Sequence, residues 1–569
     1  MGGNKAVKVM QETDRLAVGK LLTKRAHIAP NSRALLYYKQ QTEYTYGEFN
    51  KIAGDVAKGL IAFGAERGSH AAVWAINLPE WLFIQFGCAK AGIPLVAINS
   101  NYRAYELEYV LKQSETTTLF IADGASQPGE YLAAIYEICP ELRTTRPGCL
   151  QAARLPALKN VVFLGKEQQP GMFTWQGFFA KSKTISDKEL AVRENTVKGE
   201  DIFTIQYTSG TTGTPKGAML THSSYVINAF ETAKYQGLTP QDISCIPLPF
   251  FHAYGCIAVM AAVAAGAAIA VIEQFNAQEL VKTLEGCQAT AVCGTPTMFV
   301  AALEELSHHC YDLSSLRGGN MAGAFCPPQL VQAVVDKLGA REFGILYGST
   351  EAIISIMNRW DDSLEHRINT LGQALPEVEL KIVDPQTGET VAAGTAGELC
   401  IKSPSRMKGY YKMPEATAQA IDSAGWLHSG DLACIDTEGY CRITGRIKDM
   451  IIRGGENVYP AEIEEFLTTH PKIKDAQVVG IPCEYYGEEV VAFVRLQAGQ
   501  SATPLEIKRY CRERIAIHKV PAQFLFVEQY PQTASGKVQK FKLRELAIQL
   551  LSEKIHKNRG ACQNEQTAN

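Results

Sequence analysis

Apolar runs alternate with amphipathic segments through the first two thirds of the chain. Residues 44–65 carry apolar side chains at helical spacing, with Thr45 placed to cap the helix. Residues 70–76 and 93–99 are short apolar runs, typical of buried strands, and between them lies a helical segment that ends at Gly92. Continuous apolar strands between helices are typical of parallel sheets covered on both faces. The pattern therefore predicts an α/β fold.

The same alternation returns at residues 118–123, 268–272 and 288–296, and the pattern changes further along the chain. After about residue 375, short strands joined by Gly-rich turns predict an antiparallel, barrel-like piece. From about residue 449, mixed helical and strand patterns predict a small α+β unit of roughly 100 residues. The polar stretch 552–569 is expected to fray.

The longest apolar stretch, Cys256–Ile272, does not predict a transmembrane span. It holds 17 residues, many of them Ala and Gly, whereas a helix needs about 20 to cross a bilayer. Gly266 divides it, so we expect a buried helix followed by a buried strand.

Composition and charge narrow the class of protein. A chain of 569 residues with 46% hydrophobic and 20% charged residues is globular and long enough for about three to four domain-sized units. The formal net charge of −3 gives no general reason to bind nucleic acid or an anionic membrane. Any anionic ligand must therefore be held by a local site.

The cysteines and the N-terminal residues favour a cytoplasmic protein. The chain has 15 cysteines, none spaced as C-x-x-C, and Cys88, Cys256 and Cys293 stand in apolar runs, as small buried side chains do. The first 16 residues lack the apolar core of a signal peptide.

Residues 207–217, YTSGTTGTPKG, have the composition of a phosphate-binding loop. Glycines let several backbone N–H groups converge on one anion, hydroxyls add donors, and Lys216 adds a positive charge. The alternative is a flexible linker, but the run stands between a strand-like segment and residues 218–230, which look helical. It is not a Walker A loop, because Gly217 follows the lysine. The candidate nucleotide-binding residues are Thr208, Ser209, Gly210, Thr211, Thr212, Gly213 and Lys216.

With this loop and the motifs below, the chain resembles the adenylate-forming enzymes, which include acyl- and aryl-CoA synthetases, firefly luciferase and peptide-synthetase adenylation domains. The resemblance runs from about Thr45 to Leu543. In YGSTE it implies that Tyr347 stacks on adenine, that Thr350 contacts the α-phosphate, and that Glu351 helps to hold Mg²⁺. The other nucleotide-binding residues that it implies here are Gly348, Ser349, Gly323 and Ala324.

The resemblance extends to the last quarter of the chain. In WLHSGD, Asp431 is the candidate for both ribose hydroxyls, and Arg446 is the candidate for ribose and phosphate, although it could instead form a surface salt bridge. Lys448 falls at the position of the family's hinge. Lys537 in PQTASGK falls at the position of the family's catalytic lysine. Without the matching motif, a lysine on a polar loop would be read as a solvated charge. Gly454, Gly455 and Glu456 resemble the loop that lines the pantetheine tunnel.

The resemblance implies a two-step reaction in a two-domain enzyme. A carboxylic acid attacks ATP to give an acyl-adenylate and pyrophosphate, and the thiol of CoA then displaces AMP. It implies a large N-terminal domain, residues 1–447, of two helix-covered, mostly parallel sheets plus a distorted β-barrel. A small mobile α+β domain, residues 448–549, and a polar tail, 550–569, follow. We expect a monomer or homodimer with no nucleic-acid partner and no transmembrane span.

The segment beside the acyl pocket, Pro247–Gly255, points to an apolar acid. His252 and its aromatic neighbours are candidates to wall or gate the pocket, the alternative being core packing around one histidine. No acidic residue occurs from Cys245 to Ile272, so nothing in the segment would compensate a buried ammonium. A medium-chain fatty acid is favoured, then an aromatic or alicyclic acid.

Three alternatives to a CoA ligase stay open. The acyl group could pass to a carrier-protein thiol or, as in luciferase, be oxidised. A silent nucleotide-binding regulator could also keep the fold, although the joint presence of Lys216, Glu351, Asp431, Arg446 and Lys537 argues against it.

Overall fold

The computed structural model describes residues 16–125, 127–208, 215–453, 456–483, 485–533 and 537–551. Contacts divide the chain into two units. The first is Met1–Leu380 with Ile401–His428, and the second is Lys381–Cys400 with Ser429–Asn569. The boundary predicted between residues 447 and 448 rests on the family's hinge and stays a prediction. The polar tail predicted for 552–569 lies outside the described residues.

The first unit contains two large sheets. A nine-stranded sheet has the order β16-β15-β14-β13-β12-β10-β11-β1-β2, and its central strands, from β14 to β1, are parallel. Its strands are β1 (Arg33–Tyr37), β2 (Thr42–Thr45), β10 (Ile243–Ile246), β11 (Ala268–Val271), β12 (Ala291–Gly294), β13 (Gly318–Met321), β14 (Glu342–Ser349), β15 (Ile353–Met357) and β16 (Gln373–Ala374).

An eight-stranded sheet has the order β19-β9-β8-β4-β3-β5-β6-β7 and is parallel from β8 to β7. Its strands are β3 (His70–Trp74), β4 (Leu95–Ala97), β5 (Thr116–Ile121), β6 (Asn160–Phe163), β7 (Phe173–Thr174), β8 (Ile202–Thr208), β9 (Lys216–Thr221) and β19 (Gly409–Tyr410). One expectation was wrong: residues 216–221 form strand β9, which pairs antiparallel with β8, and the helix begins only at His222. Apolar Ala218 and Leu220 are buried in this sheet, so tertiary pairing overrides the helical appearance of the segment.

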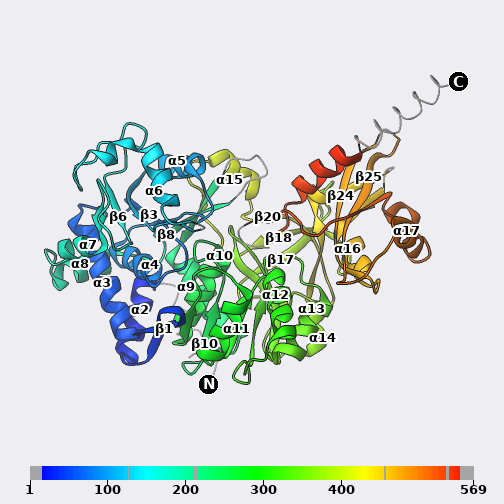
Figure 1. Ribbon diagram of the computed structural model, residues 1–569, viewed down its shortest axis with the longest axis horizontal. Helices are drawn as coiled ribbons and strands as arrows, with labels where there is room; N and C mark the ends of the chain where they lie inside the picture. Colours follow the sequence, from blue (N-terminus) through cyan, green and yellow to red (C-terminus); the bar gives the residue numbers. More distant parts are fainter. Residues whose placement is uncertain are drawn as a thin grey trace. The chain divides into compact units, whose positions relative to one another are not determined.

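Helices cover these sheets (Figure 1). Helix α9 contacts β9 of one sheet and β15 of the other. The α-helices of the first unit are α2 (Val18–Ile28), α3 (Tyr46–Ala62), α4 (Pro79–Ala91), α5 (Ala104–Gln113), α6 (Glu130–Ile138), α7 (Trp175–Ser182), α8 (Asp187–Thr196), α9 (His222–Tyr235), α10 (Ala253–Ala265), α11 (Ala277–Gly286), α12 (Pro296–His308), α13 (Pro328–Ala333), α14 (Leu364–Asn369) and α15 (Pro414–Ala420). Short 3₁₀ or π turns occur at η1 (Tyr38–Gln40), η2 (Pro140–Arg143) and η3 (Val334–Leu338).

Local signals in the sequence set several of these boundaries. Thr45 caps α3 as predicted, because its side chain accepts from the backbone N–H of Glu48 in a capping box. Helix α4 ends at Gly92, whose left-handed φ of 67° suits a glycine. The apolar stretch 256–272 splits at Gly266 into the end of α10 and β11, as predicted. Among the described residues, no helix is long and apolar enough to cross a membrane.

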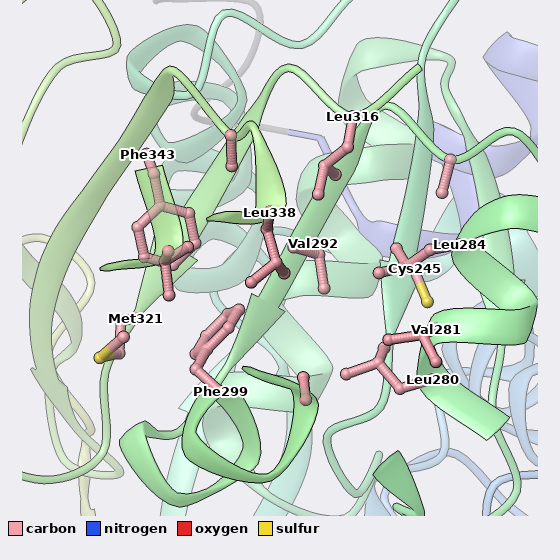
Figure 2. Packing of buried hydrophobic residues seen from close by; sticks show 14 of the residues in the cluster. Cys245, Leu280, Val281, Leu284, Val292, Phe299, Leu316, Met321, Leu338 and Phe343 are labelled. Atoms are coloured by element: carbon pink, nitrogen blue, oxygen red, sulfur yellow. The ribbon is translucent and has the colours of Figure 1, made fainter. Parts of the chain in front are cut away.

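One hydrophobic core lies between the nine-stranded sheet and helices α11 and α12 (Figure 2). Val292 of β12 and Phe343 of β14 lie within it, with Leu280 and Leu284 from α11. Phe299 of α12 packs edge-on against Phe343, with ring centroids 5.0 Å apart. This packing holds the strands whose carboxyl ends carry the candidate site.

The second unit is an α+β structure. It holds most of a four-stranded sheet, ordered β17-β18-β20-β21, and a five-stranded sheet in which β25 is central and pairs with the long edge strand β24 and with β22 and β26. The strands are β17 (Glu379–Val383), β18 (Gly397–Lys402), β20 (Leu427–Ile435), β21 (Cys441–Arg446), β22 (Ile451–Arg453), β23 (Glu456–Val458), β24 (Ile473–Cys483), β25 (Gly487–Leu496) and β26 (Gln523–Phe526). The helical elements are α16 (Pro460–Thr468), α17 (Pro504–Arg512), and the 3₁₀ turns η4 (Ile447–Asp449) and η5 (Ile517–Lys519).

Candidate active site

Thr208 and Lys216 lie on β8 and β9 of the eight-stranded sheet. Four loops of the first unit, three of which carry other candidate residues, leave neighbouring parallel strands at one edge of the nine-stranded sheet. They follow β10, β12, β13 and β14, and they begin with Pro247, Thr295, Ala322 and Thr350. The chain passes from β10 to β11 on one side and then to β12 on the other side of β10. Connections diverge at such a point, and open α/β sheets bind ligands in the crevice formed there.

A buried asparagine ties this edge to the eight-stranded sheet. Asn77 follows β3, and its side-chain N–H₂ group donates to the carbonyls of Leu248 at 2.8 Å and Ile272 at 3.1 Å. Its side-chain oxygen accepts from the backbone N–H of Phe250 at 2.8 Å. Because these three partners belong to the loops after β10 and β11, one amide fixes where the carboxyl ends of both sheets meet.

The YGSTE motif forms a tight turn. Strand β14 ends at Ser349, and the chain returns as β15 from Ile353. A Cβ on Gly348 would lie 1.9 Å from the carbonyl oxygen of Ile353, so only glycine fits there. Ile353 has a φ of 56°, which is unusual for a β-branched residue and indicates local strain. The turn presents Thr350 and Glu351 beyond the edge of the sheet.

The candidate adenine-binding residues lie on adjacent strands of the same sheet. Tyr347 is half-buried on β14, opposite Ile356 of β15. Gly323 and Ala324 follow β13, the strand next to β14. Gly323 has a left-handed φ of 90°, and Ala324 is exposed. The fold therefore brings together segments that are more than twenty positions apart in the chain.

Lys216 and Glu351 meet around a tyrosine that the motif analysis did not single out. The Tyr410 hydroxyl donates to Oε1 of Glu351 at 2.8 Å, and the Lys216 ammonium nitrogen lies 5.3 Å from the centroid of the Tyr410 ring. Burial and the neighbouring Glu351 carboxylate raise the pKa of Tyr410 well above its usual value. The backbone N–H of Met407 also donates to the Glu351 carbonyl, at 2.7 Å. Lys216, the candidate for phosphate, and Glu351, the candidate for the metal, thus both contact the Tyr410 side chain.

The loop after β10 carries His252 at the start of α10. Nδ1 of His252 accepts from the backbone N–H of Tyr254 at 3.2 Å, so this histidine caps the helix. The Tyr254 hydroxyl donates to the backbone carbonyl of Asn320 on β13 at 3.1 Å. Phe250 is fully buried and packs edge-on against Trp81, so its ring belongs to the core. Among the described residues, Nδ2 of the buried Asn320 has no hydrogen-bond partner.

In the second unit, the two candidate ribose-binding residues form an ion pair. Asp431 and Arg446 are directly paired across β20 and β21, and Nε of Arg446 lies 2.7 Å from Oδ1 of Asp431. The Asp431 side chain is largely buried, while that of Arg446 is half exposed. A carboxylate held by a rigid guanidinium is well suited to accept hydrogen bonds from the two hydroxyls of a cis-diol.

The other candidates of the second unit lie on separate elements. Lys448 is exposed on η4, and Glu456 begins β23, paired with Arg453 of β22. Lys537 is half-buried, and its backbone N–H donates to Oγ1 of Thr533 at 3.1 Å. Seven candidates lie outside the described residues: Ser209, Gly210, Thr211, Thr212, Gly213, Gly454 and Gly455.

Motif reading missed Tyr410, Asn77 and Asn228. Asn228 of α9 donates to the Ile354 carbonyl at 2.7 Å, which ties the helix after the phosphate-loop strand to the YGSTE turn. Each is a single polar or aromatic residue outside the motifs. The one signal in the sequence that could have pointed to such a residue is weak: Asn77 is a polar residue in an otherwise apolar run.

Two family models and several curated proteins match most of the chain. The family described as AMP-binding enzyme matches residues 22–411, and the AMP-binding enzyme C-terminal domain matches 462–537. The Bacillus subtilis protein named "Putative acyl-CoA synthetase YngI" is 45% identical over 548 residues, covering 95% of this chain and 99% of that protein. The mitochondrial medium-chain acyl-CoA ligase ACSF2 of Danio rerio is 39% identical over 521 residues, covering 91% of this chain and 86% of that protein.

Solved structures are similar along nearly the whole chain. ATP-bound MatB from Rhodopseudomonas palustris superposes with a TM-score of 0.81 at 27% identity, covering 93% of this chain and 99% of that one. The anthranilate CoA ligase AuaEII in complex with anthranoyl-AMP also has a TM-score of 0.81 at 27% identity, covering 94% and 97%.

The fold and the matches define an AMP-forming acid–CoA ligase, with a carboxylic acid, ATP and CoA as substrates. The chain belongs to the AMP-binding enzyme family. The predicted family, α/β fold class and acyl-CoA synthetase activity are therefore confirmed.

Proposed function

We propose that this acyl-CoA synthetase activates a medium-chain fatty acid. The observation that carries the proposal is the apolar character of the segment beside the crevice. No acidic residue occurs from Cys245 to Ile272, and α10 within it is buried on all sides. A substrate ammonium there would lack a carboxylate partner in the segment, whereas an alkyl chain gains by burial. The ACSF2 relatives carry the name medium-chain acyl-CoA ligase, which supports the same class of acid.

Glu351 fits a role in holding Mg²⁺ together with the phosphates of ATP. One carboxylate oxygen is oriented by the Tyr410 hydroxyl, and the residue lies in a turn at the crevice edge. Mg²⁺ prefers one or two carboxylates combined with phosphate oxygens, which matches a single acidic residue here. When bound, the metal neutralises phosphate charge and orients the reacting phosphate.

Adenylation requires two anions to approach each other. We assign Lys216 to the departing phosphates and Thr350 to the α-phosphate, while Tyr347, Gly323 and Ala324 hold the adenine side. The cation of Lys216 lowers the repulsion that the acid meets as it attacks. In-line positioning of acid and phosphate then converts a slow bimolecular reaction into an intramolecular one. His252, which caps α10, is assigned to the wall of the acyl pocket.

The second unit supplies the remaining assignments. The Asp431–Arg446 pair takes the ribose, and Lys537 offsets charge at the α-phosphate during adenylation. Lys448 is the hinge residue, and Gly454, Gly455 and Glu456 line the path of the pantetheine thiol. We propose that the small domain, residues 448–549, turns about Lys448 between the half-reactions, so that Lys537 serves the first half-reaction and the glycine loop the second.

We propose that the enzyme is located in the cytoplasm. No disulfide bond joins the 14 cysteines of the described residues, and most of them are buried, which suits a reducing compartment such as the cytoplasm. Burial raises the pKa of Cys256 and Cys293 to about 12, so these thiols are inert. We expect a monomer or homodimer, which sedimentation of the purified chain would establish.

The acid is tested by a substrate panel. AMP formation is measured with Mg²⁺, ATP and CoA on octanoate, acetate, palmitate, benzoate, cyclohexanecarboxylate and leucine. We expect the highest kcat/KM with octanoate and none with leucine. A higher value for benzoate or cyclohexanecarboxylate would overturn the medium-chain assignment in favour of an aryl or alicyclic acid.

The same panel with a pantetheinylated carrier protein in place of CoA separates the two thiol acceptors. Oxygen consumption coupled to AMP release would mark the oxidative alternative. A chain that binds ATP but releases neither AMP nor pyrophosphate with any acid would be a regulator.

A further inference from the structure

The side chain of Tyr410 contacts both charged groups of the proposed phosphate site, the Lys216 ammonium and the Glu351 carboxylate. In the ladder between β19 and β9, Tyr410 is opposite Ala218. Lys216 stands two residues before Ala218 on the same strand, and side chains two apart lie on the same face. The Tyr410 ring is therefore the diagonal neighbour of Lys216, which explains the 5.3 Å between its centroid and the ammonium nitrogen.

Tyr410 is buried, and three hydrogen bonds hold the backbone at Tyr410 and Tyr411. The N–H of Tyr410 donates to Oγ1 of Thr417 at 2.9 Å, and the N–H of Tyr411 donates to the Gly217 carbonyl at 2.8 Å. The side-chain N–H₂ group of Gln113 donates to the Tyr411 carbonyl at 2.7 Å. A side chain fixed in this way can impose its position on the groups that it contacts.

Tyr410 also joins the two sheets of the first unit. It belongs to the eight-stranded sheet, whereas Glu351 follows β14 of the nine-stranded sheet. Two hydrogen bonds link the segments, one from the Tyr410 hydroxyl to the Glu351 carboxylate and one from the Met407 N–H to the Glu351 carbonyl. The bond from the Met407 N–H holds the backbone of the turn, and the bond from the Tyr410 hydroxyl orients the Glu351 carboxylate.

We propose that Tyr410 is a positioning residue that orients the Glu351 carboxylate through its hydroxyl and restrains the Lys216 ammonium through its ring. The proposal rests on the proposed roles of Glu351 toward Mg²⁺ and of Lys216 toward phosphate. Under this proposal, Tyr410 contacts Glu351 and Lys216 and touches neither the metal nor the phosphates. Its two contacts are chemically distinct, so two substitutions separate them.

Tyr410→Phe removes the hydroxyl and keeps the ring. We expect the Mg²⁺ concentration for half-maximal activity to rise about tenfold, the scale of a hydrogen bond to a charged group, with KM for the acid unchanged. Tyr410→Leu removes the ring as well, so KM for ATP should rise further, by about three- to tenfold. Tyr411→Phe is the matched control, because its hydroxyl bonds the exposed Glu115 at 3.0 Å.

A binding measurement gives a readout independent of turnover. Calorimetric titration with a non-hydrolysable ATP analogue is done with Mg²⁺ and with EDTA. Tyr410→Phe should weaken binding only with Mg²⁺ present. Combined with Glu351→Gln, it should add little, because both changes act on the same carboxylate.

The outcomes discriminate between the proposals. If Glu351→Gln alters Mg²⁺ dependence and Tyr410→Phe does not, the positioning role is overturned while the proposed metal role stands. If Glu351→Gln leaves the Mg²⁺ dependence unchanged, the proposed metal role of Glu351 is wrong, and the positioning role of Tyr410 is wrong with it. Should Tyr410→Leu fail to fold, Tyr410→Phe decides alone, since it retains the buried ring.

Discussion

Asp431 and Arg446 are separated by fourteen intervening residues, yet they face each other across β20 and β21 with 2.7 Å between Oδ1 and Nε. The pairing follows from the hairpin register, which places the two residues directly opposite. A guanidinium that fixes one carboxylate oxygen also fixes the plane of the carboxylate. Two residues that look like independent candidates in the sequence therefore act as one structural group.

Asp431→Asn should raise KM for ATP by about ten- to a hundredfold, the scale of losing charge-assisted hydrogen bonds. The measurement is the ATP dependence of AMP formation, with 2′-deoxy-ATP as a second substrate. The variant should lose most of the discrimination between the two nucleotides. Glu513→Gln is the control, because Glu513 also pairs with an arginine, Arg509, but on an exposed surface. An unchanged KM in Asp431→Asn would contradict the ribose assignment.

Lys537→Ala should abolish acyl-adenylate formation and leave thioester formation from preformed acyl-adenylate largely intact. The reason is that, in the proposed mechanism, its cation acts only while the acid attacks the α-phosphate. Pyrophosphate exchange reports the first step, and thioester formation from synthetic acyl-adenylate reports the second. Lys542→Ala removes an exposed lysine nearby in the chain and should affect neither step. Equal losses in both assays would refute the assignment.

Gly348→Ala should damage both stability and activity. The added Cβ meets the Ile353 carbonyl oxygen at 1.9 Å, so the YGSTE turn must shift and carry Glu351 with it. We expect the free energy of unfolding to fall by about 1–3 kcal/mol, which is typical of overpacking. Activity should fall more than tenfold. The urea midpoint is followed by tryptophan fluorescence, since all five tryptophans lie in the first unit.

Gly54→Ala is the matched control for that substitution. Gly54 lies in α3, and its added Cβ would be 3.5 Å from the nearest side-chain atom, an ordinary contact. Alanine favours a helix over glycine, so this variant should keep or gain stability. Wild-type stability in Gly348→Ala would show that the turn adapts to a side chain.

His222 should make the first unit less stable as the pH falls. Burial lowers the pKa of His222 from 6.5 to about 4, and its Nδ1 accepts from the backbone N–H of Val18. The unfolded chain therefore binds the proton more readily than the folded one. Stability from this group is complete above pH 6.5 and is lost as the pH falls toward 4, by about 2 kcal/mol between pH 7 and pH 5.

His222→Gln removes this titration. Its free energy of unfolding, from urea titrations at pH 7 and pH 5, should change less with pH than that of the wild type. The exposed His27→Gln variant serves as control and should keep the wild-type pH dependence. An identical pH dependence in His222→Gln would show that this imidazole is accessible to water in the folded protein.

Sequence reasoning succeeded where the signal is local. Thr45 and Gly92 mark helix ends through backbone chemistry that acts within a few residues, and Gly266 splits the longest apolar stretch for the same reason. It failed at residues 218–221, which look helical in the sequence but belong to strand β9, paired with the distant strand β8. The motif glycines were found as residue types, but the reason for Gly348 appears only beside Ile353.

The sequence by itself determined the α/β class, the family and the chemical types at the site, because helix caps, apolar periodicity and motif composition are properties of neighbouring residues. Which of those residues touch depends on how distant segments of the chain fold together. Tyr410 joins Lys216 to Glu351, and Asn77 joins the two sheets, through contacts between segments far apart in the chain. Such contacts depend on strand order and register, which many distant side chains set together through burial.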